Sequence, residues 1–147
     1  MYEPWSSSIA TRKVMQGNRG RDTKPEFAVR RLVHARGLRY RVNSRPEPSL
    51  RRTADLLFTR ARVAVFIDGC FWHGCPVHFN LPATNTEYWE SKISRNRARD
   101  LETTNLLKQR GWMVLRFWEH DPVEAVADSI VGAVRAKYLC LDTTTKY

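Results

Sequence analysis

The sequence predicts a single mixed α/β domain in which a mixed sheet is flanked by helices. The chain of 147 residues is long enough for one hydrophobic core and too short for two ordinary domains. Its hydrophobic and charged fractions, 42% and 27%, are typical of a globular protein. Helical and strand-like periodicities follow one another in the order α-β-β-β-α-β-α, which favours a sheet with helical connections. We therefore expect one domain over residues 23–138, preceded by an arm (1–22) and followed by a C-terminal tail (139–147).

The first elements are an arm, a helix and a short strand. The predicted arm is basic and contains glycines, and its cationic residues are Arg12, Lys13, Arg19 and Arg21. Residues 23–26 (TKPE) form a capping box that predicts a helix from there to about Arg36, with Phe27 and Leu32 buried and Gly37 ending it. Residues 38–42 then predict a short strand, and residues 43–52 a loop that contains proline.

The second part of the chain predicts a hairpin, two helices and a further strand. Residues 54–58 and 62–68 are apolar, β-branched or aromatic runs joined by a tight turn, which indicates a hairpin. Residues 69–82 are irregular. A second capping box, 84–87, predicts a long helix ending at Gly111, and 112–118 predict another strand. Asp121 and Pro122 begin a last helix. We expect these helices to bury Trp89, Ile93, Leu101 and Leu107, and Val126, Ile130 and Val134.

The positive charge lies in the first part of the chain. The net charge is +10, and residues 1–62 carry 15 Lys and Arg against 5 Asp and Glu, whereas residues 63–147 are balanced. A basic segment beside a neutral one is typical of a surface that binds nucleic-acid phosphates, which makes Arg12, Lys13 and Arg19 of the arm candidate DNA contacts, although a solvated surface gives the same composition. The arginines do not fall on one amphipathic helix, which argues against a membrane surface.

Two aspartates of the predicted hairpin are candidate metal ligands. Asp55 lies near the start of one strand and Asp68 ends the other, so that their pairing brings both carboxylates to the same end of the sheet. Oxygen ligands at one edge, with positions left for water and phosphate, suit a magnesium-dependent nuclease. The alternative is that both residues only cap turns.

The segment after Asp68 has the composition of a zinc site. Cys70, Cys75 and His78 lie within nine residues, and His120 follows the strand that ends at Trp118. Four such ligands without a vacancy are typical of structural zinc. A chance cluster of buried thiols and surface histidines is the alternative. Three cysteines argue against a disulfide framework, and Cys140, outside the cluster, is expected to pack as a small apolar residue.

Three residues between the cysteines suggest further chemistry. His73 lies five residues after Asp68, and its imidazole has the pKa range of a general base that deprotonates water. Phe71 and Trp72 are adjacent aromatics in an expected loop. They suit a wedge that enters between base pairs, or a cover over the zinc site, and the residues alone do not separate the two hypotheses.

Several motifs resemble one family over roughly residues 10–135. They include Arg21-Asp22-Thr23-x-x-Glu26, Ala54-Asp55, Val65-Phe66-x-Asp68-Gly69-Cys70-Phe71-Trp72-His73 and Pro82-Ala83-Thr84-x-Thr86-Glu87-Tyr88-Trp89. The order continues with Lys92-Ile93, Asn96, Arg99-Asp100, Gly111-Trp112 and Trp118-Glu119. With these motifs the chain resembles the very-short-patch repair endonucleases.

The resemblance implies a single-domain restriction-endonuclease-like core (α-β-β-β-α-β) with a zinc-stapled loop. It assigns catalytic Mg²⁺ to Asp55 and the main-chain carbonyl of Ile67, and a contact with metal-bound water to Glu26. His73 matches the family's catalytic histidine. Two further sets match the zinc ligands and the DNA wedge: Cys70, Cys75, His78 and His120, and Met15, Phe71 and Trp72.

The chain also departs from the pattern of related nucleases. Ala54 and Cys70 stand where that superfamily usually has proline and lysine, which leaves His73 as the candidate for proton transfer. Some members of the family carry a histidine at the position of Asp68. We therefore expect Asp68 to take part in catalysis either by orienting His73 or by binding a water of the metal shell.

The expected function is a DNA endonuclease that nicks one strand of double-stranded DNA beside a T:G mispair, with a functional link to a cytosine-5 DNA methyltransferase. Alternatives are a restriction-associated nickase with the same core and a catalytically silent DNA-binding module. Apolar stretches are too short for a membrane span and the N-terminus lacks a signal-peptide core. We therefore expect a cytoplasmic protein that is associated with the nucleoid when it is bound to DNA. We also expect it to be a monomer.

Overall fold

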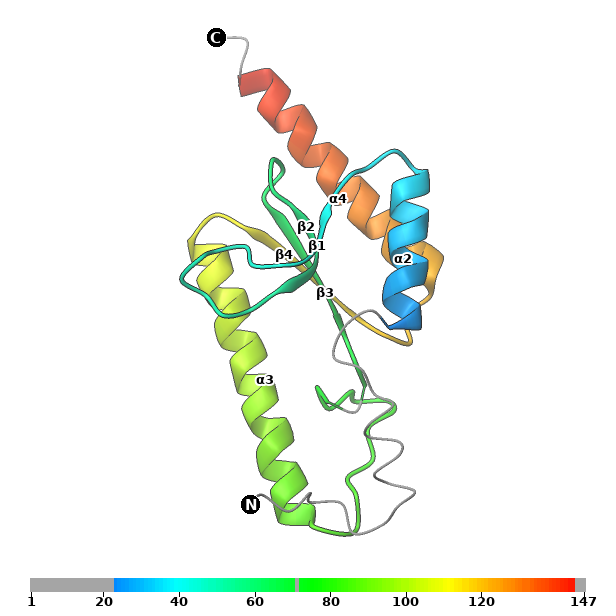
Figure 1. Ribbon diagram of the computed structural model, residues 1–147, viewed down its shortest axis with the longest axis vertical. Helices are drawn as coiled ribbons and strands as arrows, with labels where there is room; N and C mark the ends of the chain where they lie inside the picture. Colours follow the sequence, from blue (N-terminus) through cyan, green and yellow to red (C-terminus); the bar gives the residue numbers. More distant parts are fainter. Residues whose placement is uncertain (1–22, 71, 145–147) are drawn as a thin grey trace.

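The sheet lies at the centre of the molecule with helices on both faces (Figure 1). The computed structural model describes residues 23–70 and 72–144. Its strands stand in the order β1-β2-β3-β4, with β1·β2 and β2·β3 antiparallel and β3·β4 parallel. Their bounds are Arg41–Ser44, Ala54–Phe58, Val63–Asp68 and Met113–Trp118. The predicted mixed α/β domain is thereby confirmed.

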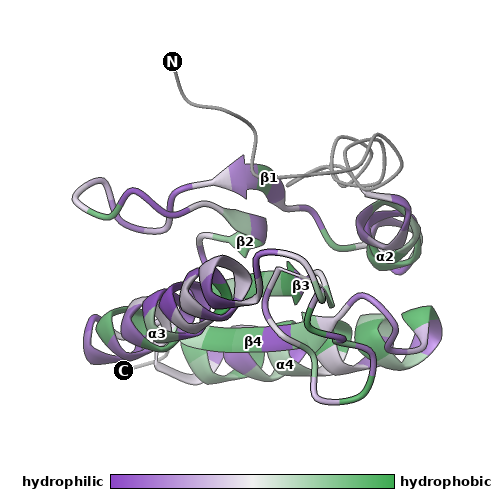
Figure 2. Cartoon of the chain, turned by 90° about the horizontal axis from the view of Figure 1, so that it is seen from below, coloured by the Kyte–Doolittle hydropathy of each residue, from purple (hydrophilic) through white to green (hydrophobic). Residues whose placement is uncertain are grey.

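Successive side chains along each strand point to opposite faces of the sheet, so the sheet separates two hydrophobic cores. Helices α2 (Lys24–Ala35) and α4 (Val123–Thr144) pack on one face, and α3 (Thr86–Gln109) covers the other (Figure 1). Figure 2 shows β3 and β4 as mostly hydrophobic ribbon next to helices with many hydrophilic residues. The larger core includes Val33, Leu56, Val63, Val65, Ile130 and Val134, and the smaller one Leu57, Ala64, Phe66, Leu107 and Trp112.

The strands agree with the sequence prediction best where both faces are apolar. Residues 54–58 and 63–68 form the predicted hairpin, with Leu56 opposite Val65. The first strand begins at Arg41 and not at Leu38, and Leu38 is instead buried before the strand. The shift follows from pairing, because Arg41 and Ser44 stand opposite Leu57 and Ala54.

The inward face of α2 differs from the predicted apolar face, whereas α3 buries Trp89, Ile93 and Leu107 as predicted and, of the expected residues, exposes only Leu101. Phe27 is 51% exposed and Leu101 is 63% exposed, so the prediction that both are buried was wrong. The buried face of α2 consists of Glu26, Val29, Arg30 and Val33, and that of α3 of Trp89, Ile93, Thr103 and Leu107. On α2 the inward Glu26 and Arg30 form an ion pair, and on α3 the hydroxyl of Thr103 donates to the carbonyl of Arg99 within the helix.

The ends of the helices are partly as predicted. Thr23 caps α2, and Gly37 follows it with a φ of 91°, a conformation that glycine adopts readily. The predicted capping box at 84–87 is wrong: α3 starts at Thr86 after Asn85, whose φ is 55° and whose side chain makes no capping hydrogen bond. The hydroxyl of Thr86 donates instead to the carbonyls of Pro82 and Ala83.

Helix α4 buries the expected residues and extends further than the predicted domain. Val126, Ile130 and Val134 are all buried. The helix continues through residues 139–144, which the sequence analysis assigned to a tail, and Cys140 is exposed on it, not packed as predicted. Within the described residues, no helix is both long and apolar enough to cross a membrane.

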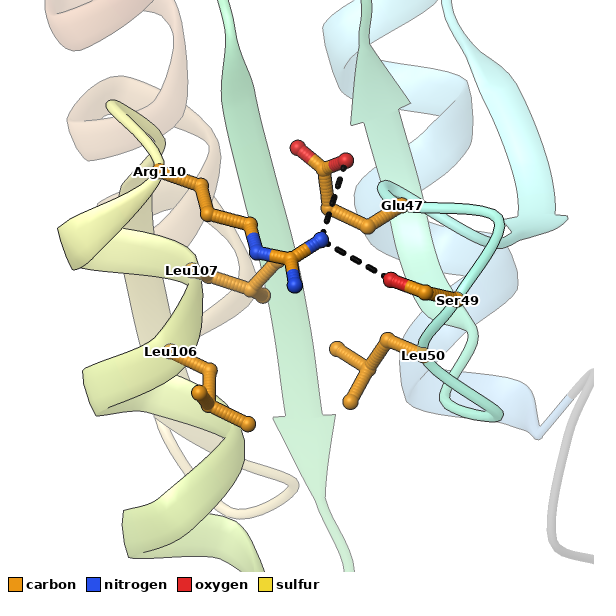
Figure 3. Close-up of a pocket in the computed structure, with 6 residues that line it drawn as sticks. All are labelled: Glu47, Ser49, Leu50, Leu106, Leu107 and Arg110. Atoms are coloured by element: carbon orange, nitrogen blue, oxygen red, sulfur yellow. Dashed lines mark hydrogen bonds and ion pairs between the residues drawn. The ribbon is translucent and has the colours of Figure 1, made fainter.

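The loop between β1 and β2 is fastened to the C-terminal end of α3 (Figure 3). Arg110 donates to the hydroxyl of Ser49 at 2.8 Å and lies 3.6 Å from the carboxylate of Glu47. The indole of Trp112 donates to the same carboxylate at 2.8 Å. Beside these contacts, leucines of the loop and the helix line a pocket of about 140 Å³. The contacts fix this loop to the helix that also carries part of the site.

Candidate active site

Asp55 lies near the start of β2, beside the backbone of β3. Its Oδ2 accepts a 2.6 Å hydrogen bond from the Ile67 N–H. Burial raises the pKa of Asp55 to about 7, against the lowering effect of that hydrogen bond, and the charges of Glu26 and Asp68 raise it further. The antiparallel hairpin thus gathers these carboxylates at one end of the sheet. A cation bound there would relieve their mutual repulsion.

Glu26 reaches this region from the first turn of α2. Only 2% of the residue is exposed, and its Oε2 lies 3.3 Å from Nη2 of the buried Arg30. Tyr40 donates a 2.7 Å hydrogen bond to the carbonyl of Arg30. Arg30 compensates the charge of Glu26 in the interior, and α2 thereby holds Glu26 near Asp55.

His73 is oriented by a carboxylate on α3. Its Nδ1 is hydrogen-bonded to Oδ2 of Asp100, and Oδ1 of Asp68 lies 3.8 Å from the same nitrogen. Burial lowers the pKa of His73, but the Asp100 hydrogen bond and the charge of Asp68 outweigh burial, so the pKa is raised overall. Because Nδ1 is engaged, Nε2 is the nitrogen that can act on a water molecule.

Arg116 joins the two acids near His73. Its Nη1 donates to Oδ1 and Oδ2 of Asp68 at 3.0 and 3.2 Å, and its Nη2 donates to the main-chain carbonyl of Asp100 at 3.3 Å. The guanidinium also stacks 4.3 Å from the centroid of the Phe66 ring. Burial raises the pKa of Asp68 overall, although the charges of His73 and Arg116 act in the opposite direction.

Helix α3 also holds the main chain around His73. Asn96 donates to the carbonyl of Trp72 at 2.8 Å, and Arg97 donates to the carbonyls of His73 and Gly74. Gly74 has a φ of 63°, a conformation that glycine adopts readily, and a Cβ there would contact the Arg97 guanidinium and lie 2.7 Å from Cγ2 of Ile93. Glycine therefore suits the bend between the two cysteines.

A second group of side chains could hold a metal ion. Donor atoms of Cys70, Cys75, His78 and His120 all lie within 4.8 Å of one another. Nδ1 of His120 is 3.1 Å from Sγ of Cys70, 3.6 Å from Sγ of Cys75 and 3.1 Å from Nδ1 of His78. Ligands bound tetrahedrally at zinc distances are separated by about 3.3–3.8 Å. The donor separations lie close to these values, so the four residues could hold one metal ion.

The segment that carries these donors is tied to the end of β4. Oε1 of Glu119 accepts a 3.0 Å hydrogen bond from the N–H of Cys70. The N–H of Glu119 donates a 3.0 Å hydrogen bond to the carbonyl of Asp68. His120 follows directly. Because β3 and β4 are parallel, their C-terminal ends meet at one edge, and both metal-binding candidates are built there.

Comparison with known proteins identifies the family. The family model described as DNA mismatch endonuclease Vsr matches residues 7–78. The Type II nicking enzyme V.NaeI of Lentzea aerocolonigenes is 46% identical over 122 residues, which cover 79% of this chain and 74% of that protein. The chain belongs to the Vsr family. It is accordingly a DNA endonuclease.

Two further relatives support membership in the Vsr family. The Type II nicking enzyme V.NmeDIP of Neisseria meningitidis serogroup C is 44% identical over 131 residues, covering 86% of each chain. The DNA mismatch endonuclease Vsr of Escherichia coli (strain K12) is 38% identical over 112 residues, covering 75% of this chain and 70% of that protein. The names describe nicking and mismatch-directed enzymes of one family.

The structure of this Vsr-family chain brings most of the predicted site residues to the C-terminal edge of β3. Cys70, Cys75, His78 and His120 form one cluster. Asp55 interacts electrostatically with Glu26 and Asp68, and Asp68 lies 3.8 Å from His73. The ring of Trp72 packs 6.1 Å from that of Trp89. The remaining predicted DNA contacts lie outside the described residues: Met15, Phe71, Arg12, Lys13 and Arg19.

Sequence reasoning gave no role to Asp100, Arg116 or Asn96. Asp100 and Asn96 were noticed only as parts of motifs. Each contacts a residue at least 24 positions away, so local spacing does not reveal the contact. A signal for Arg116 existed in the sequence, because a single arginine interrupts the apolar run from Met113 to Trp118 and such a charge requires a partner.

Proposed function

We propose that this Vsr-family endonuclease nicks one strand of double-stranded DNA beside a T:G mispair, in the manner of very-short-patch repair. The observation that supports this proposal best is the arrangement at the end of the hairpin. There a carboxylate that is costly to ionise, Asp55, lies near Glu26, and the His73–Asp100 pair lies at the same edge of the sheet. A cation site beside an oriented imidazole suits phosphodiester hydrolysis.

Asp55 and the main-chain carbonyl of Ile67 would hold Mg²⁺, and Glu26 would bind one of its waters. The donor chemistry fits, because Mg²⁺ prefers oxygen ligands and usually retains several waters. Burial, together with the charges of Glu26 and Asp68, raises the pKa of Asp55, and a divalent cation would compensate the charge of the ionised group. When bound, the ion would stabilise the charge that develops on the phosphoryl oxygens.

His73 would be the general base. Its Nδ1 is engaged by Asp100, so Nε2 would accept the proton of the attacking water. The hydrogen bonds from α3 to the carbonyls of Trp72, His73 and Gly74 keep the backbone of the histidine in place. Positioning the base before DNA binds reduces the reorganisation that the reaction requires.

Zinc would occupy the Cys70, Cys75, His78 and His120 group in a structural role. Four protein donors leave no coordination position for a substrate. The ion would link the segment after β3 to the residue that follows Glu119, and so stabilise the loop that carries His73. Stabilisation of this kind replaces hydrophobic packing in an irregular segment.

Phe71 and Trp72, with Met15 of the arm, would enter the helix stack beside the mispair. A T:G wobble pair weakens local stacking, so opening that step costs less than at a matched pair. Basic residues of the arm (1–22), among them Arg12, Lys13 and Arg19, would bind phosphates and supply affinity without discrimination. The packing of Trp72 on Trp89 is compatible with a ring that moves on binding or with a cover for the metal loop.

A functional link to a cytosine-5 DNA methyltransferase belongs to the same proposal, because deamination of 5-methylcytosine produces a T:G mispair. In this proposal the protein is a monomer that acts on DNA in the cytoplasm and associates with the nucleoid. The endonuclease domain would span residues 23–138.

Cleavage of matched, T:G-mismatched and otherwise mispaired duplexes, each labelled on both strands, tests the proposal. We expect a nick in one strand of the T:G duplex that requires Mg²⁺ and is absent from Asp55→Asn. The relatives named Type II nicking enzymes favour a second candidate, a nickase in a restriction-modification setting. Equal nicking of matched and mismatched duplexes would favour that candidate, and binding without cleavage would favour a silent module.

A further inference from the structure

Arg116 is a charged residue in an otherwise apolar strand. It lies in β4 opposite Phe66 of β3, and in a parallel pair this register places its side chain beside residue 68 on the same face. The guanidinium makes the two hydrogen bonds to Asp68 and the one to the Asp100 carbonyl described above. Its Nε donates to the hydroxyl of Thr104 on α3 at 2.8 Å. The side chain is 21% exposed, so Arg116 is a partly buried cation with defined partners.

Two carboxylates face a single nitrogen of His73. Asp100 Oδ2 is hydrogen-bonded to Nδ1, and Asp68 Oδ1 lies 3.8 Å from the same atom. A neutral imidazole with its proton on Nδ1 donates one hydrogen bond there, so only one of the acids is its acceptor at a time. If Asp68 took that hydrogen bond, the ring would turn and Nε2 would move with it.

We infer that Arg116 is a positioning residue that keeps Asp68 from competing with Asp100 for His73. Both oxygens of Asp68 accept hydrogen bonds from Nη1 of Arg116, and charge-assisted hydrogen bonds are stronger than those between neutral groups. Asp100 is thereby the acceptor of the Nδ1 proton, and Nε2 stays where the proposed reaction needs it. The inference rests on the proposed role of His73.

A merely structural role for Arg116 predicts different behaviour. Its bonds to Thr104 and to the Asp100 carbonyl join β4 to α3, and losing them would lower stability whatever the state of Asp68. In contrast, a positioning role depends on the charge of Asp68. Removing that charge should therefore compensate for the loss of Arg116, which it would not do if the contacts with α3 were what mattered.

The experiment compares Arg116→Met, Asp68→Asn and the double variant. Methionine retains apolar contact with Phe66. Steady-state nicking is measured well below the lowest melting temperature, on whichever duplex the wild-type enzyme nicks. We expect Arg116→Met to lower kcat by about tenfold to a hundredfold. This loss does not exceed the effect expected from removing the general base itself, which is about a hundredfold or more. The KM for DNA should stay within about twofold, and the double variant should recover at least about tenfold in kcat over Arg116→Met.

Arg62→Met is a matched control. Arg62 also stacks on an aromatic ring, 4.6 Å from the centroid of Trp112, and donates to a main-chain carbonyl, that of Arg110, at 2.6 Å. It lies at the opposite end of β3 from Asp68. The control should lower the melting temperature and leave kcat unchanged, which separates loss of packing from loss of positioning.

The inference is overturned if Arg116→Met keeps the wild-type kcat, or if the double variant is no more active than Arg116→Met. Should Arg116→Met fail to fold, Arg116→Lys decides the matter. Lysine keeps the charge beside Asp68 and loses the fork that reaches Thr104 and the Asp100 carbonyl. Positioning predicts a kcat within about fivefold of wild type, whereas a loss as large as that of Asp100→Asn overturns it. Loss of nicking in Asp55→Asn tests the proposed function separately.

Discussion

Replacement of Asp55 by asparagine should stabilise the metal-free protein while abolishing nicking. The carboxylate is desolvated and lies near Glu26 and Asp68, and its pKa rises from 3.8 to about 7. Asparagine retains a carbonyl oxygen that can accept the hydrogen bond from the Ile67 N–H, and it carries no charge. The variant thus removes the free-energy cost of burying a charged carboxylate and keeps the hydrogen bond from the Ile67 N–H. It should therefore gain stability and lose activity.

The size and sign of this change in unfolding free energy follow from the coupling between protonation of Asp55 and folding. The folded state binds the Asp55 proton more tightly than the unfolded state, so the cost is absent at low pH, grows above pH 3.8 and is complete above about pH 7. One pKa unit corresponds to about 1.4 kcal/mol, so the cost is about 4 kcal/mol at pH 8 and about 2 kcal/mol at pH 5. Asp55→Asn should exceed the wild type in unfolding free energy by roughly these amounts.

Urea denaturation of both proteins at pH 5 and pH 8, in magnesium-free buffer without a chelator that would remove zinc, measures the difference. Titration of the groups that do not interact with Asp55 is common to both proteins and cancels in the comparison. The reasoning that ionised Asp55 destabilises the folded protein would be refuted by either of two results. One is a difference in unfolding free energy that is the same at pH 5 and pH 8, and the other is a variant that is less stable than the wild type at pH 8. Added Mg²⁺ should stabilise the wild type and have little effect on the variant.

Three further outcomes are expected. Purified protein should contain about one zinc per chain, and chelation should lower its melting temperature, as should Cys75→Ser in proportion to lost zinc; active, well-folded protein without zinc would contradict this. Asp100→Asn should reduce the kcat of nicking by about a hundredfold with little change in KM, because His73 loses the negative charge that stabilises its protonated form; an unchanged kcat would argue against His73 as the base. Trp72→Ala should reduce the preference for mismatched over matched duplex, while Arg12→Ala should weaken both alike and flatten the salt dependence. A folded Trp72→Ala protein with full preference would exclude the wedge.

The hairpin was predictable because its residues are apolar on both faces, and that signal is local. Asp55 and Asp68 were placed at one end of the sheet by antiparallel pairing alone. The rotation of α2 was not predictable from apolar periodicity, because the inward positions include Glu26 and Arg30, which form an ion pair inside the protein. The periodicity instead favoured Phe27, which is exposed.

The partners of His73 required the tertiary structure. Asp100 lies 27 residues from His73, and nothing in the spacing shows that the fourth turn of α3 passes beside the loop. The start of α3 was missed for a different reason. The Thr84–Glu87 pattern has the composition of a capping box, but the left-handed backbone at Asn85 begins the helix two residues later. A pattern of residue types specifies a capping box only when the backbone conformation allows it.

The position of Cys140 makes the protein suitable for site-selective attachment of a fluorophore without any mutation. All three cysteines are free, but Cys70 and Cys75 are buried and Cys140 is exposed on α4. Thiol reagents require an accessible thiolate, so a maleimide dye should react at Cys140 and spare the other two. The C-terminal end of α4 lies at the opposite end of the molecule from the segment after β3 (Figure 1). A dye placed there can therefore report the approach and release of labelled DNA during each turnover, without touching the chemistry that it follows.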